Sequence, residues 1–143
     1  MNRLIKNPVR IAIVAFITVP LFLSCGRNKE AVDELGKYYN EMIEIADSSA
    51  GQLDTAQDGK EASRIIETFI EKRDDLFEKG KTLSGKYPDM ENDPALKEYE
   101  MALDRSMKRF AKSLERAVDK YRGVKEFKKA VKGFGAKLSR NKE

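Results

Sequence analysis

Three long stretches of the chain carry apolar residues at alternating spacings of three and four, the spacing of one helical face. The repeating positions of the first stretch, about residues 29 to 50, are Val32, Leu35, Tyr39, Met42, Ala46 and Ser49. Those of the second, about 58 to 85, are Ala62, Ile65, Ile66, Phe69, Ile70, Arg73, Leu76, Phe77, Gly80 and Leu83. Those of the third, 93 to 121, are Leu96, Tyr99, Leu103, Met107, Phe110, Leu114, Ala117 and Tyr121. No β-branched stretch alternates apolar with polar residues, so the sequence predicts helices and no strands.

Local signals place the ends of these helices. The first helix should weaken at Ser48-Ser49-Ala50-Gly51 and give way to a linker that continues to Gly59. Asp58 and Glu61 have the spacing of a capping box at the start of the second helix. Gly85 and the Tyr87-Pro88 step should stop it. The third helix should begin with Asp93 as its N-cap and Pro94 at its first helical position.

The apolar pattern continues beyond the third helix. Val124, Phe127, Val131, Phe134 and Leu138 keep the helical spacing, while Gly123, Gly133 and Gly135 should soften this end. We therefore expect an all-α protein, an antiparallel three-helix bundle or coiled coil. Its long C-terminal helix either overhangs the bundle or folds back as a short fourth helix. An overhanging helix would expose an apolar face that needs a lipid surface, a partner or a second copy of the chain.

The first 25 residues have a different pattern. Arg3, Lys6 and Arg10 precede an apolar stretch over residues 11–23, and small residues come after it. A positive start, a short apolar stretch and a small-residue exit are typical of a secretory signal. This stretch of 13 residues, interrupted only by Thr18 and Pro20, spans about 20 Å as a helix, against about 30 Å of bilayer hydrocarbon. The segment is therefore too short to serve as a permanent transmembrane helix.

The end of this signal resembles the lipobox of bacterial lipoproteins, formed here by Phe22, Leu23 and Ser24 before Cys25. The resemblance implies that Cys25 receives a diacylglyceryl group, that the signal is cut before it, and that the new amino group is acylated, for example with palmitate. It also implies a protein anchored in the cell envelope. Gly26 instead of Asp after the cysteine favours the outer over the inner membrane in a Gram-negative host. An ordinary secretory signal cut after Gly26 remains the alternative.

The charge of the chain after the signal is uneven. Residues 25–119 carry 16 basic and 22 acidic side chains, whereas residues 120–143 carry nine basic and two acidic ones. We divide the chain into a signal (1–24), a lipidated tether (25–28), a helical bundle (29–122) and a basic amphipathic tail (123–143). The residues predicted to contact an anionic surface are Lys120, Arg122, Lys125, Lys128, Lys129, Lys132, Lys137 and Arg140.

That anionic surface could be phospholipid, lipopolysaccharide, a teichoic polymer or a protein. The simpler interpretation is a solvated helix end, where the helix dipole favours lysine. No nucleic-acid-binding motif is present, so nucleic acid is not an expected partner. Self-association through the apolar stripe of the third helix is a further possibility.

The residue inventory restricts the chemistry. The chain has no His, no Trp and one Cys, which excludes Ser-His-Asp and Cys-His catalysis, imidazole metal ligands and an intramolecular disulfide. Asp89, Glu91, Asp93 and Glu100 have partial EF-hand spacing, but Pro94 stands where that loop needs Gly. Asp74 and Asp75 are neighbours on a helix and should form part of a solvated face. We therefore expect neither a metal nor a cofactor, and no enzymatic activity.

These observations favour a lipid-anchored cell-envelope protein that acts as a non-catalytic binding or scaffolding module. One alternative is a periplasmic carrier that holds an apolar ligand between Phe69, Phe77 and Phe110. Another is a plain secreted helical protein.

Overall fold

The computed structural model of the protein describes residues 29–140, with side chains to Leu138. This part of the chain contains four long helices: α2 (Lys29–Thr55), α3 (Gly59–Lys86), α4 (Lys97–Tyr121) and α5 (Lys125–Arg140). Two short 3₁₀ turns, η1 (Pro88–Met90) and η2 (Pro94–Leu96), connect α3 to α4. The described residues include no strand, and the predicted all-α class is confirmed.

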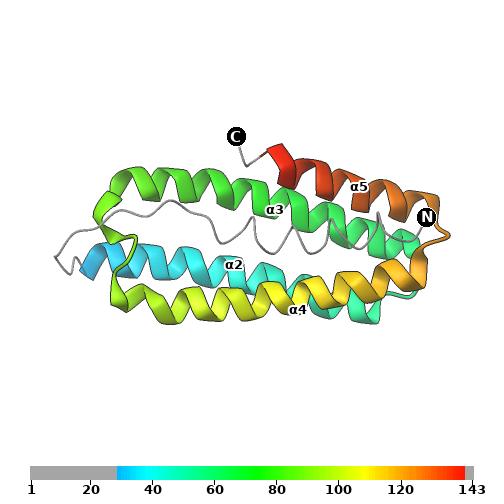
Figure 1. Ribbon diagram of the computed structural model, residues 1–143, viewed down its shortest axis with the longest axis horizontal. Helices are drawn as coiled ribbons and strands as arrows, with labels where there is room; N and C mark the ends of the chain where they lie inside the picture. Colours follow the sequence, from blue (N-terminus) through cyan, green and yellow to red (C-terminus); the bar gives the residue numbers. More distant parts are fainter. Residues whose placement is uncertain (1–28, 141–143) are drawn as a thin grey trace.

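α2 and α3 form a central hairpin, with α4 packed along α2 and α5 packed along α3 (Figure 1). α2 and α3 are antiparallel, with ion pairs Lys86–Glu34 at 2.9 Å and Lys79–Glu41 at 2.7 Å. α4 runs along α2 in the same direction, and Arg116 Nη2 lies 2.7 Å from Asp54 Oδ1. α5 turns back beside α3, so the order across the molecule is α4, α2, α3, α5. Of the two arrangements left open for the C-terminal helix, the structure therefore has the one that folds back.

Three aromatic rings from three helices form the centre of the core. Phe69 of α3 and Phe110 of α4 are stacked with their ring centroids 4.0 Å apart. Phe134 of α5 meets both rings edge-on, at 5.8 and 6.1 Å. α2 contributes mainly small side chains here, including Ala46 and Ala50, which are fully buried. The ring contacts make α5 part of the main core.

A second, smaller cluster lies at the end of the bundle where α2 begins. Ala31, Met90 and Leu96 are buried there, with Tyr39 and Tyr99 packed against them. The backbone at Gly36 supports the Tyr99 ring so closely that a Cβ would lie 2.9 Å from its Cζ. Gly80 of α3 lies closer still to Tyr38 of α2, where a Cβ would lie 2.5 Å from the phenol oxygen.

Both predicted N-caps are confirmed. Asp58 Oδ1 accepts hydrogen bonds from the backbone amides of Lys60 and Glu61, at 2.9 and 2.8 Å. Asp93 Oδ1 accepts from the amide of Ala95 at 2.8 Å. The turn that Pro94 begins is 3₁₀, however, and the α-helix starts only at Lys97.

The predicted end of the first helix is wrong. α2 continues through Gly51 to Thr55, five residues beyond the expected boundary. Ser49, Ala50 and Leu53 are buried on its inner face, and Gln52 donates to Ser48 within the helix. Burial of this face offsets the poor helix propensity of the Ser-Ser-Ala-Gly segment.

Candidate functional site

The residues of the predicted lipid-attachment site, Phe22, Leu23, Ser24 and Cys25, lie outside the described residues. The structure therefore bears on their role only through the position of the first described helix. α2 begins at Lys29, four residues after Cys25. Along the chain, the predicted anchor is therefore close to the end of the bundle where α2 begins. The turns η1 and η2 lie at the same end.

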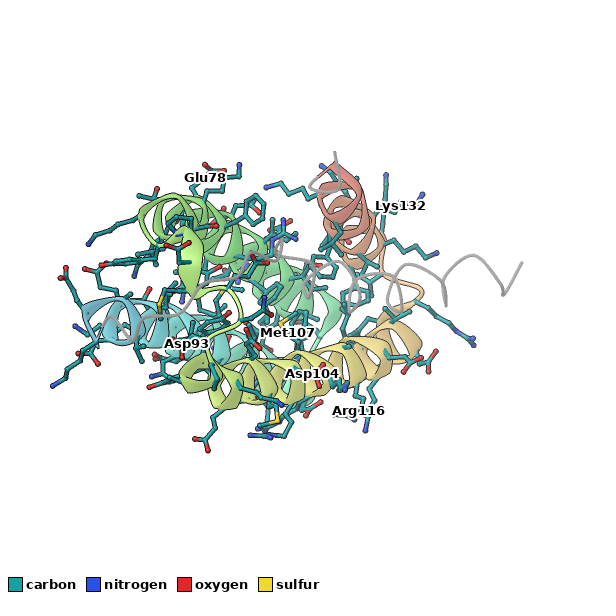
Figure 2. All side chains as sticks on the ribbon, turned by 60° about the vertical axis from the view of Figure 1, so that its left-hand side comes forward. Glu78, Asp93, Asp104, Met107, Arg116 and Lys132 are labelled. Atoms are coloured by element: carbon teal, nitrogen blue, oxygen red, sulfur yellow. The ribbon has the colours of Figure 1, made fainter. Side chains whose placement is uncertain are left out.

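α5 has two chemically opposite sides. Phe127, Ala130, Phe134 and Leu138 are buried against the bundle. Lys125, Lys128, Lys129 and Lys132 are exposed and repeat at the helical spacing of three and four, so they share the outer face of the helix. We call these four residues the lysine stripe. Figure 2 shows Lys132 on the outer side of α5, away from the interior position of Met107.

No residue of the lysine stripe forms an ion pair with an acidic group in the described part of the chain. The one acidic residue on the helix, Glu126, is exposed between them. Four unneutralised ammonium groups within two helical turns produce a concentrated positive field. The surface is therefore suited to attract anionic material.

The other predicted surface residues have different surroundings. Lys120 donates to the carbonyl of Ala56 at 3.1 Å and lies over the Tyr121 ring. Lys137 is paired with Asp74 at 2.6 Å. Arg122 is exposed, and the side chain of Arg140 is outside the described part. The structure thus separates the lysine stripe from two lysines that hold the bundle together.

A charged cluster joins α3 to α5. Arg73 is only 3% exposed, and its Nε and Nη2 both donate to Asp74 Oδ1. Lys137 of α5 donates to Asp74 Oδ2. Burial alone would raise the pKa of Asp74, but the hydrogen bonds from Lys137 and Arg73 outweigh it and hold this pKa below its ordinary value.

This cluster differs from the prediction that Asp74 and Asp75 form a solvated face. Asp75 is exposed, as expected, whereas Asp74 is half-buried and bridges two helices. Helical periodicity correctly places Arg73 on the buried stripe. Its Nη1 is also buried and has no hydrogen-bond partner. No signal in the sequence indicates that Lys137 is the second partner of Asp74, because the two residues lie 63 positions apart along the chain.

The end of the bundle near the start of α2 is acidic. Residues 86–100 contain two basic and five acidic side chains. Burial, with a contribution from Glu100, raises the pKa of Tyr39 in this region. Asp93, the third acidic residue of the EF-hand-like spacing, accepts the amide hydrogen bond of Ala95 as the cap of η2. Within residues 29–140, no group of three or more potential metal-binding side chains comes together.

The aromatic positions named for an apolar ligand do not line one space. Phe69 and Phe110 are in direct contact with each other and with Phe134. Phe77 is outside that cluster, and Lys81 Nζ lies 4.7 Å from its ring centroid. A ligand at this position would have to separate stacked rings. Among the described helices, none is both long and apolar enough to cross a membrane.

Comparison with known proteins gives no relative from which a function could be transferred. No family model, no curated protein sequence and no solved structure matches the chain.

Proposed function

We propose that the protein is a lipid-anchored component of the bacterial cell envelope that acts as a non-catalytic binding module. The observation that carries this proposal is the chain's single cysteine, which stands where the secretory signal ends, four residues before α2. A lone thiol in an oxidising compartment would be open to unwanted disulfide exchange. Lipidation converts the thiol to a thioether, which cannot take part in that exchange. Two or three acyl chains hold a protein stably on a bilayer, whereas one does not.

The tether between anchor and bundle is short. Four residues span at most about 14 Å when fully extended, so the bundle stays close to the bilayer surface. The described helices then act as a rigid stem that presents its surface to the envelope. The lysine stripe is a part of that surface whose four ammonium groups form no ion pair among the described residues. We assign it the contact with anionic envelope material.

The non-catalytic character rests on the residue inventory. A chain without His lacks the side chain that most often transfers protons near neutral pH. The carboxylates with lowered pKa values in the described region are paired across helix contacts or used as caps. These arrangements serve packing between helices.

The test is the intact mass of the protein expressed in a bacterial envelope, together with membrane fractionation. The wild type should begin at residue 25, carry the mass of two or three acyl chains, and sediment with membranes. A Cys25→Ala variant should lack that mass and should remain unprocessed or be released. A soluble wild-type protein with Gly26 or Arg27 at its terminus would instead identify it as plainly secreted.

A further inference from the structure

The lysine stripe lies in the half of the bundle that is remote from the predicted anchor. Lys86, the last residue of α3, pairs with Glu34 near the start of α2. α5 packs against the first half of α3, away from Lys86. There Lys137 pairs with Asp74, and Val124 lies against Gly59 at the start of α3. At 1.5 Å per helical residue, α5 begins about 40 Å from the level of Lys86 and reaches to within about 18 Å of it.

The two ends of the molecule have opposite charge. Residues 86–100, at the end nearer the anchor, have two basic and five acidic residues. Residues 122–140 have seven basic residues and one acidic residue. An anionic bilayer therefore repels the end that the tether holds beside it. At physiological ionic strength the electric field of the bilayer decays over about 8 Å. The lysine stripe of an upright bundle lies farther from the bilayer than that.

The shape of the stripe also favours one kind of partner. Its four exposed lysines extend over about 10 Å of α5, a helix that runs along the long axis of the bundle (Figure 1), so the stripe lies on the side of the bundle and not on its end. A flexible strand can lie along such a face while the bundle stands upright. A bilayer could reach it only if the bundle fell on its side, which would still leave the acidic end against the same lipid.

The chemistry of lysine agrees with this geometry. A lysine ammonium is a compact, strongly hydrated point charge, whereas arginine forms a planar fork that grips one phosphate or carboxylate with two hydrogen bonds. The four positions of the stripe are all lysine. Such a surface holds repeated charges of a polymer without selecting a single group.

We propose that the lysine stripe binds a linear polyanion, a polymer with repeated phosphate or carboxylate groups, at a distance from the bilayer that anchors the chain. This inference rests on the proposed function for its orientation. The protein then connects its membrane to an anionic polymer of the envelope, with α5 as the contact and the α2–α3 hairpin as the spacer.

The first experiment uses the lipidated protein in neutral phosphatidylcholine vesicles and linear inorganic polyphosphate as the probe. Vesicles that carry the wild type should retain polyphosphate on flotation at about 50 mM salt and release it in high salt. Replacing the stripe by glutamine (K125Q, K128Q, K129Q and K132Q together) should lower retention at least about tenfold, since each lysine near an anionic surface adds measurably to binding. Glutamine keeps a good helix propensity at these positions.

A matched variant controls for total charge. Lys60, Lys72, Lys97 and Lys112 are exposed and form no ion pair in the described part of the chain. Their joint replacement by glutamine removes the same four charges and should leave retention within about twofold of wild type. Equal losses in the two variants would overturn the proposal, because binding would then depend on net charge alone.

A second measurement tests the orientation. In phosphatidylglycerol vesicles, polyphosphate retention should persist, and amine acetylation with mass spectrometry should modify Lys128 and Lys132 as readily as Lys60. Protection of the lysine stripe together with loss of polyphosphate would show that it binds its own bilayer, and would overturn the proposal.

A third measurement separates this inference from the proposed function. The full chain with Cys25→Ser carries no anchor and can be titrated with polyphosphate in detergent solution. Binding that depends on the lysine stripe supports the polyanion site even where the wild type proves to carry no acyl mass. Failure of the unanchored chain to bind, when the wild type is acylated, rejects the polyanion site and leaves the anchor intact.

Discussion

Among single residues, the glycines show most directly how closely the helices approach. A Cβ on Gly59 would lie 2.7 Å from Cγ2 of Val124, a branched side chain next to the α4–α5 turn. A Cβ on Gly51, inside α2, would meet nothing within 4 Å. We expect Gly59→Ala to destabilise the protein by about 1–3 kcal/mol through overpacking. Gly51→Ala should stabilise it by about 0.4–1 kcal/mol, because alanine has less freedom to lose in a helix. Urea unfolding measures both, and changes of the same sign would contradict this account.

The buried Arg73 allows a second prediction at the residue scale. Its side chain is 3% exposed and relies on Asp74 as its acceptor. Asp74→Ala should cost at least about 1 kcal/mol, because it leaves the guanidinium buried without an acceptor. Arg73→Met should cost less or be neutral, since a buried charge with one unpaired nitrogen is replaced by an apolar chain of similar length. Urea unfolding should therefore show that the Asp74→Ala variant is less stable than the Arg73→Met variant. The reverse order would show that Arg73 is satisfied by a group other than Asp74.

Among the helices, α5 contributes a central ring to the core although it is the shortest of the four described α-helices. Phe134 meets Phe69 and Phe110, so Phe134→Ala should destabilise the whole bundle by about 3 kcal/mol. Lys132→Ala, two residues earlier on the outer face, should change stability by less than about 0.5 kcal/mol. Thermal unfolding monitored by circular dichroism gives both values. A small effect of Phe134→Ala would mean that α5 does not close over the core in solution.

The helices also show which features the sequence can predict. The caps at Asp58 and Asp93 are predictable, because a cap is a local arrangement of neighbouring residues. The end of α2 at Thr55 is not, since Ser49 and Ala50 stay helical only through burial against other helices. Whether the C-terminal helix overhangs or folds back also depends on contacts across more than 60 residues, such as Asp74 with Lys137.

For the molecule as a whole, charge patterns are easier to predict than their placement. The basic character of α5 is visible in the composition, and helical spacing alone puts Lys125, Lys128, Lys129 and Lys132 on one face. Only the structure shows that Lys137 and Lys120 are engaged with the bundle. Only the structure shows that the lysine stripe lies remote from the start of α2. The distance between the start of α2 and the lysine stripe is therefore a tertiary property.

Each contact between neighbouring helices includes one carboxylate whose pKa is held below its ordinary value. Glu34 is stabilised by a hydrogen bond from Lys86 between α2 and α3, and Asp54 by one from Arg116 between α2 and α4. Between α3 and α5, burial raises the pKa of Asp74, but the hydrogen bonds from Lys137 and Arg73 lower it by more. On the alkaline side, the hydrogen bonds of Lys86 and the burial of Tyr39 raise the pKa values of those two groups.

These shifts predict how stability depends on pH. A carboxylate whose pKa is lower in the folded state contributes stability that is present above its unfolded value, 3.8 for Asp and 4.5 for Glu, and lost as pH falls through the folded value. Lys86 and Tyr39 contribute stability that is present below their unfolded values, 10.5 and 10.0, and lost as pH rises through the folded ones. Since the chain has no His, we expect the urea midpoint to stay level from about pH 5.5 to 8.5. The midpoint should fall below about pH 4.5, and Asp54→Asn should make that fall smaller by removing one of the four carboxylates with lowered pKa values, Glu34, Asp54, Asp58 and Asp74. A step in the midpoint between about pH 6 and 8 would contradict this prediction, because no histidine is present to cause it.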